Sequence, residues 1–251
     1  MGSLCPARPG LRRRSLSPQL ASGRSRAWPV LERRGAPGVL HAAAPDTGGG
    51  RLACVCLPLE PAVVIGSAQP ASDFDAARLA RGGVEIVRRR SGGGAVLVAP
   101  GGQVWLDVFV PTDDPLFDPD VGRSFYWLGE VFAKAIMSTF GDLASSADIE
   151  VHTGRVRTTP WSKVLCYAGL GAGEVTVAGR KVVGMSQRRE RVGCWIHSMA
   201  LLGERAPELA GLLSGSDAYR ASARAVLEGV GLLGAAPRAG RLTEELLSLL
   251  P

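Results

Sequence analysis

The sequence predicts an α+β domain in which helices flank a central, mixed and mostly antiparallel sheet. Three observations support this fold class. Short apolar segments with strand periodicity are joined by turns. One long amphipathic pattern stands between two groups of these segments, and helical periodicity fills the C-terminal part. Strand hairpins with helices outside the sheet are typical of the α+β class.

The expected strands share alternating or continuous apolar side chains bounded by turn residues. They are 52–57, 63–65, 84–87, 95–98, 104–110, 174–178, 181–185 and 192–197. Pro100-Gly101-Gly102-Gln103 is a strong turn sequence, so we expect strands 95–98 and 104–110 to form a hairpin.

The expected helices begin at polar capping residues. Ser72-Asp73-Phe74-Asp75 opens a short helix that ends at Gly82-Gly83, and Asp120 caps the longest helix, which runs to about residue 140. Apolar residues at three- and four-residue steps give this helix one buried face, made of Val121, Phe125, Leu128, Phe132, Ile136 and Phe140. Three shorter helices are expected at 206–213, 217–230 and 242–249.

Two nucleotide-binding patterns are missing from the sequence. Gly169, Gly171 and Gly173 are spaced two apart, unlike the glycines of a dinucleotide-binding turn, and no helix clearly follows them. No Gly-x-x-x-x-Gly-Lys-(Ser/Thr) segment occurs either. The pattern therefore disfavours a Rossmann fold and excludes a P-loop.

The positive charge of the chain is concentrated at its N-terminus. The formal net charge is +6, but residues 1–52 hold nine arginines and only two carboxylates, so the remainder is nearly neutral. We therefore expect no nucleic-acid partner. Residues 1–50 are expected to form a disordered Arg/Pro-rich tail, and residues 51–251 a catalytic domain.

The N-terminal composition leaves two interpretations open. It resembles a transit peptide, which would place the protein in the mitochondrial matrix, or it reflects a translation start upstream of the natural one. We favour the second interpretation and a cytoplasmic protein. No secretory signal and no apolar stretch of about 18 residues is found, so no membrane association is expected.

The five cysteines indicate a reducing compartment, because their number is odd and no Cys-x-x-Cys pair occurs. Cys54 and Cys56 alternate along an expected strand and are interpreted as buried thiols. Together with three scattered histidines they indicate no metal site.

The segment Arg88-Arg89-Arg90-Ser91-Gly92-Gly93-Gly94-Ala95 lies between two expected strands. Glycines let the backbone approach a ligand closely, and arginines add donors for an anion. Because strand neighbours alternate, not all three arginines face the loop, and we select Arg89 first and Arg88 second. Lys181 follows a glycine turn and is one of only three lysines, which indicates a site that needs a compact ammonium group.

Together these segments resemble the lipoate–protein ligase branch of the biotin/lipoate protein ligase family. That branch carries Arg-Arg-x-Ser-Gly-Gly-Gly-Ala-Val and then Gly-(Arg/Lys)-Lys-(Val/Ile)-x-Gly-x-(Ala/Ser)-Gln, which residues 88–96 and 179–187 match. Gly66-Ser67-Ala68-Gln69 is similar to the family's Gly-x-x-Gln. The resemblance covers roughly residues 52–233.

The resemblance implies a catalytic domain of the class II synthetase and biotin-ligase type. It implies that lipoate or octanoate is joined, through an acyl-adenylate made from ATP with Mg²⁺, to a lysine of a lipoyl-domain protein. Lys181 is then the catalytic lysine, stabilising developing negative charge. The implied substrate-binding residues are Gln69, Arg88, Arg89, Ser91, Gly92, Gly93, Gly94, Ala95, Gly184 and His197.

Cys166 keeps a second activity open. It precedes Lys181 by fifteen residues, and Cys166-Tyr167 is similar to the nucleophile segment of octanoyltransferases that use an acyl carrier protein and no ATP. Its thiolate would attack a thioester and carry the acyl group to the acceptor lysine. The alternative is a buried core cysteine.

Departures from the family pattern leave a third interpretation, a non-catalytic acyl- or adenylate-binding protein. Leu97-Val98-Ala99 replaces the usual x-His-Asp, and Ile196-His197-Ser198 replaces His-His-Gly. His197 either orients a substrate or has a structural role. The chain also ends near the expected catalytic domain, so a ligase would require a separate accessory domain.

Overall fold

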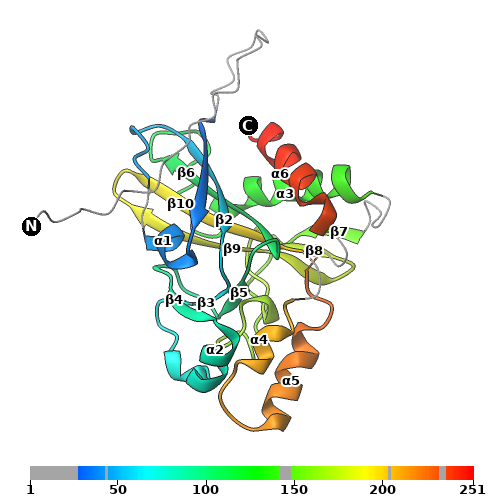
Figure 1. Ribbon diagram of the computed structural model, residues 1–251. Helices are drawn as coiled ribbons and strands as arrows, with labels where there is room; N and C mark the ends of the chain where they lie inside the picture. Colours follow the sequence, from blue (N-terminus) through cyan, green and yellow to red (C-terminus); the bar gives the residue numbers. More distant parts are fainter. Residues whose placement is uncertain (1–27, 43–44, 142–147, 203–204, 232–235) are drawn as a thin grey trace, which may run out of the picture.

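The computed structural model describes residues 28–42, 45–141, 148–202, 205–231 and 236–251. Within them, a large sheet has one face covered by helices and the other covered by a small sheet with its own helices (Figure 1). This arrangement confirms the expected α+β class with a mixed, mostly antiparallel sheet.

The large sheet has seven strands in the order β1-β2-β6-β10-β9-β8-β7. Every neighbouring pair is antiparallel except β1 and β2, which are parallel. The strands are β1 (Val30–Gly35), β2 (Leu52–Pro58), β6 (Gln103–Pro111), β7 (Ile149–Val151), β8 (Val175–Val177), β9 (Arg180–Glu190) and β10 (Gly193–Leu201).

The small sheet has three strands, in the order β4 (Glu85–Arg88), β3 (Ala62–Ile65) and β5 (Val96–Val98). The expected hairpin between strands 95–98 and 104–110 is wrong, because β5 pairs with β3 while β6 belongs to the large sheet. Both edges of β6 are taken, by β2 and β10, so no edge remains for β5. The turn at residues 100–102 instead carries the chain from one sheet to the other.

The longest helix, α3 (Tyr126–Phe140), lies beside α6 (Ala239–Ser248) on one face of the large sheet (Figure 1). The expected buried face is confirmed at Leu128, Phe132, Ile136 and Phe140. Val121 is 56 % exposed because it precedes the helix. The Asp120 carboxylate accepts hydrogen bonds from the backbone of residues 122 and 123, so it caps the short turn that leads into α3.

The remaining helices are short. They are α1 (Pro37–Ala42), α2 (Ala76–Gly82), α4 (Glu208–Gly211) and α5 (Asp217–Leu227). Gly83 ends α2 in the left-handed region, as the sequence predicts. The helix begins later than expected, because Ser72 lies in a separate short turn (Ala71–Asp73) and Asp75 caps α2 by accepting from the Arg78 N–H. In the part of the chain that the structure describes, no helix combines the length and the apolarity needed to cross a bilayer.

The central strand β6 is buried along its whole length because both faces of the large sheet are covered. Val104, Leu106 and Val108 pack towards α3 and α6. The alternate residues Trp105 and Phe109 belong to the core formed with the small sheet. This second core contains the candidate site.

The expectation of a disordered tail through residue 50 is wrong for its last part. β1 pairs in parallel with β2, from Val30 opposite Ala53 to Gly35 opposite Pro58, and α1 buries Leu40. The Arg-rich composition conceals this strand, because its exposed and half-buried positions alternate at the sheet edge. Residues 1–27 of the expected tail lie outside the described residues.

Candidate functional site

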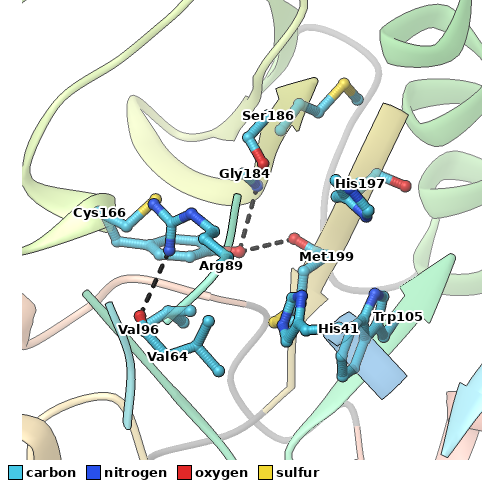
Figure 2. A pocket seen from close by; sticks show the side chains of 13 residues that line it. His41, Val64, Arg89, Val96, Trp105, Cys166, Gly184, Ser186, His197 and Met199 are labelled. Carbon is cyan, nitrogen blue, oxygen red and sulfur yellow. Dashed lines mark hydrogen bonds between the residues drawn. The ribbon is translucent and has the colours of Figure 1, made fainter. Parts of the chain in front are cut away.

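A cavity of about 420 Å³, a volume that includes open solvent at its mouth, lies between the small sheet and the large sheet. We call it the central cavity. Its wall is mostly apolar, and it includes four of the residues that the sequence singled out: Arg89, Cys166, Gly184 and His197. Figure 2 shows Cys166 and Arg89 on one side of the cavity and His197 on the other.

The glycine loop is shaped by close backbone approaches. A Cβ on Gly66 would lie 1.9 Å from the Gly93 carbonyl oxygen, and a Cβ on Gly94 would lie 2.7 Å from the Leu165 backbone. Gly93 has a φ of 98°, which only glycine adopts readily. These glycines therefore let two other segments pack directly on the loop. A Cβ on Gly92 would meet nothing within 4 Å.

Arg89 holds this loop in place. Its buried guanidinium donates to the carbonyl oxygens of Gly92 and Gly94, both at 2.8 Å, and of Val64 at 3.3 Å. Arg88 donates to three carbonyls of residues 66–69 and does not reach the central cavity. Both arginines thus bind the protein backbone, and Arg89 also contributes to the cavity wall.

Gln69 and Ser91 brace the same region without lining the central cavity. The Gln69 amide donates to Asp73 and to the Val164 carbonyl at 3.1 Å. The Ser91 hydroxyl lies 2.9 Å from that of Ser186 on β9, and Ser186 does line the cavity. These polar contacts fix the glycine loop between the segment before Cys166 and the large sheet.

Cys166 begins a short turn (Cys166–Ala168) that is hydrogen-bonded to the glycine loop. The Ala95 N–H donates to the Val164 carbonyl at 2.8 Å, and the Cys166 N–H donates to the Ala95 carbonyl at 2.9 Å. The thiol is free and half-buried. The three other described cysteines, Cys54, Cys56 and Cys194, are buried, and burial raises the pKa of each thiol.

Lys181, at the start of β9, is buried directly behind this turn. Its ammonium lies 2.6 Å from a Glu174 carboxylate oxygen and donates to the carbonyls of Cys166 at 2.9 Å and Gly169 at 3.1 Å. An ammonium has three protons, so these contacts satisfy it fully. Lys181 does not line the central cavity.

Glu174 was not predicted from the sequence. Both of its carboxylate oxygens also accept backbone N–H groups, one from Gly171 and one from Met185. It therefore ties the turn after Cys166 to β9. A single glutamate before a strand gives no local signal of this role.

Tyr167 connects the Cys166 turn to the large sheet. Its hydroxyl donates to the Met199 carbonyl at 2.6 Å and accepts from the Gly184 N–H at 3.1 Å (Figure 2). A Cβ on Gly184 would press on the ring at 3.2 Å, which explains the glycine. Burial raises the pKa of Tyr167 well above its usual range, so the hydroxyl remains protonated.

The wall opposite Cys166 carries a histidine and an aspartate. Nδ1 of His197 lies 2.9 Å from a carboxylate oxygen of Asp107, whose other oxygen accepts from the Trp105 indole at 2.7 Å. The Asp107 oxygen and Nδ1 of His197 are close enough for an ion pair, but their geometry is not that of a hydrogen bond. Burial is the largest single influence on the pKa of His197 and lowers it, but the charge of Asp107 and its side-chain interaction with the ring together raise the pKa overall.

His41 also lines this wall, although the sequence placed it in the disordered tail. Its ring lies 4.4 Å from the Trp105 ring and 6.1 Å from the His197 ring, between centroids. Burial, helped by neighbouring positive charges, lowers the pKa of His41 to about 4, so the imidazole is neutral at pH 7. No sequence motif identifies His41, because only the parallel pairing of β1 brings α1 to the cavity.

No cluster of three or more histidine, cysteine or acidic residues that could hold a metal ion occurs within the described ranges.

Comparison with known proteins identifies the family. The sequence profile of the lipoyl protein ligase A/B catalytic domain matches residues 46–226, which is more than half of the chain. The protein therefore belongs to the lipoyl protein ligase A/B catalytic domain family, as the resemblance in its motifs implied. No curated protein sequence matches it.

Solved structures share the fold at low sequence identity. A bipartite lipoate protein ligase from Thermoplasma acidophilum is 14 % identical with a TM-score of 0.65, over 89 % of this chain and 82 % of that one. A putative lipoate protein ligase from the same organism, with bound lipoic acid, is 15 % identical with a TM-score of 0.61, over 89 % and 84 %. A lipoate-protein ligase A bound with ATP is 16 % identical with a TM-score of 0.59, over 89 % and 85 %.

Proposed function

We propose that this protein attaches a lipoyl or octanoyl group to a lysine of a lipoyl-domain protein, and that Cys166 carries the acyl group. The observation that supports this best is the position of the Cys166 thiol. It is the one free cysteine of the described residues that is not buried, it lines an apolar cavity, and its backbone carbonyl accepts from the buried ammonium of Lys181.

The central cavity suits a medium-length acyl chain. Val64, Val96, Trp105 and Met199 contribute apolar wall. Burying an eight-carbon chain would contribute about 5 kcal/mol at roughly 0.8 kcal/mol per methylene.

The reaction has two acyl transfers. In the first, the Cys166 thiolate attacks the carbonyl of an acyl-carrier thioester, the new S–C bond forms, and the carrier leaves as a thiolate that takes a proton. In the second, the neutral amine of the acceptor lysine attacks the Cys166 thioester. The C–N bond forms, the Cys166 sulfur leaves, and the amine proton passes to it.

Lys181 would support both steps electrostatically. Its ammonium already donates to the backbone carbonyl of Cys166, the residue that carries the reacting sulfur. If the ammonium gave up one of its backbone carbonyl partners for the carbonyl oxygen of the acyl group, it would contact the negative charge that develops on that oxygen. Because Cys166 must remain a free thiol, we place the activity in a reducing compartment, the cytoplasm.

ATP-dependent ligation is the second candidate, and one observation favours it. An apolar pocket of about 220 Å³ adjoins the central cavity and shares Val96 and Tyr167 with it. A nucleobase would have to open this pocket further while the acyl chain occupies the central cavity. Because the described residues offer no acidic cluster for a metal, Mg²⁺ would have to be held largely by the nucleotide phosphates.

Intact-mass measurement separates the two candidates. We expect an octanoyl-carrier thioester, without ATP, to add one octanoyl group that hydroxylamine removes. Cys166→Ser should abolish the adduct, whereas the control Cys5→Ser should keep it. Acyl-adenylate formed from octanoate and ATP, with no adduct, would instead make the protein a ligase. No product in either reaction would favour a non-catalytic binding protein.

A further inference from the structure

A second cavity of about 400 Å³, a volume that includes open solvent at its mouth, lies beyond the wall opposite Cys166. It shares two lining residues with the central cavity, His41 and His197. In Figure 2 both histidines lie across the central cavity from Cys166. The histidine pair is therefore the partition between an apolar cavity, which holds the thiol, and a polar one.

The second cavity has an excess of positive charge. Arg33, Arg90 and Arg188 contribute to its wall, together with Asp107. Asp107 is already engaged by Trp105 and His197. The wall therefore favours an anion.

Two of these guanidinium groups have no carboxylate partner among the described residues. Arg188 lies 2.7 Å from Glu190, which offsets its charge. Arg33 donates to the Leu40 and Val39 carbonyls and interacts with the Cys56 thiol, none of which is a carboxylate, and Arg90 is exposed. Arg33 and Arg90 thus remain available to an anionic group that enters the second cavity.

The histidine pair that forms this partition contains an unsatisfied polar atom. The Nε2 atom of His41 is buried and has no hydrogen-bond partner within the described ranges. Leaving a buried polar atom unpaired is costly, and the apolar end of an alkyl chain cannot pair with it. A neutral imidazole can donate one N–H to a carboxylate oxygen.

We propose that this protein prefers, over a plain octanoyl group, an acyl group of similar length that carries a carboxylate at its far end, and that His41 is the residue that selects this carboxylate. This inference rests on the proposed function, because the position of Cys166 fixes which end of the chain reacts. The activated carbonyl lies at Cys166, the methylenes fill the central cavity, and the distal carboxylate passes the histidine pair towards Arg33 and Arg90. The substrate class is a medium-chain dicarboxylic acid activated at one end. Segment 28–42 is thereby part of the substrate site, although it lies outside the residues that match the family profile.

Equilibrium binding tests this without any chemistry. We expect octanedioate to bind the full chain at least about tenfold more tightly than octanoate at pH 7, measured by calorimetry. His41→Leu and Arg90→Ala should each remove most of that preference, while His41→Gln, which keeps a donor, should retain part of it. Arg81→Ala, a change of an exposed arginine on α2, is the matched control and should leave both affinities unchanged.

The acylation assay distinguishes failure of this inference from failure of the proposed function. Octanoyl and 7-carboxyheptanoyl thioesters are compared for their rate of Cys166 acylation. If neither reacts but octanedioate binds more tightly in a His41-dependent way, the transferase proposal fails and the selection of a distal carboxylate stands. Equal or weaker binding of octanedioate, or a preference that survives His41→Leu, overturns the inference whatever the transfer assay shows.

Discussion

Lys181 has a structural role and a proposed catalytic role, and a single substitution would remove both at once. Its ammonium is 6 % exposed and forms an ion pair with an equally buried Glu174 carboxylate. Removing one member of such a pair leaves an uncompensated charge, which typically costs about 3–5 kcal/mol. Loss of activity in Lys181→Ala would therefore report on both folding and catalysis.

A double variant separates the two roles. We expect Lys181→Met to lower the free energy of unfolding by about 3–5 kcal/mol. Adding Glu174→Gln should restore most of this, because the buried charge is removed and one oxygen still accepts a backbone N–H. Acyl transfer should stay about 100- to 1,000-fold below the parent in both variants. Urea unfolding and transfer rates measure the two effects, and recovery of transfer in the double variant would show that Lys181 is only structural.

At the scale of elements, the glycine loop and the Cys166 turn form one unit. Gly94 lets the two backbones touch, and hydrogen bonds between Ala95 and the Cys166 segment join them. Gln69, which follows β3, donates a further hydrogen bond to the same segment. The three glycines of the loop are therefore not equivalent, because Gly94 is needed for packing and Gly92 is not.

The matched pair Gly66→Ala and Gly92→Ala tests the same kind of difference, because Gly66 packs directly on the loop at Gly93 whereas Gly92 has open space. The added methyl of Gly66→Ala would meet the Gly93 carbonyl oxygen at 1.9 Å, so we expect a loss of about 1–3 kcal/mol in unfolding free energy. Gly92→Ala meets nothing, so its stability should be unchanged. Chemical denaturation checks both variants. Equal stability of the two would mean that the loop can move away from β3 at little cost.

The motifs located part of the site, and the tertiary structure supplied the rest. Local sequence sufficed for the glycine loop, for the turn before Lys181 and for the helix face of α3, because each depends on neighbouring residues. It could not locate His41 or Asp107, which reach the cavity through strand pairing between distant segments. The hairpin expected around residues 100–102 failed because a turn sequence is the same whether the chain returns to its own sheet or crosses to another.

At the scale of the whole molecule, two half-buried histidines contribute to the free energy of unfolding with opposite pH dependences. The pKa of His41 is lowered to about 4, so its contribution is present above about pH 6.5 and is lost as the pH falls towards 4. The pKa of His197 is raised, so its contribution is complete below about pH 6.5 and is lost as the pH rises through the raised value.

Comparison of the parent with His41→Gln isolates the first effect. Between pH 7 and pH 5 the parent should lose about 1–2 kcal/mol more unfolding free energy than the variant, because only the parent must expel a proton from His41 to fold. Urea unfolding at the two pH values measures this difference. Parallel pH profiles would indicate that His41 is solvated in the folded protein.

The hydrogen bonds that join the glycine loop to the Cys166 turn have a consequence for the length of acyl chain that the protein selects. Arg89, Ala95 and Gln69 hold together the backbone of the glycine loop and of the Cys166 turn. The short Cys166 side chain has one rotatable bond, so it can change the distance from the sulfur to the histidine pair only a little. An acyl group that is two carbons too short cannot span that distance, and one that is two carbons too long must bend. We therefore expect a sharp optimum in chain length even among acids that share the same end groups.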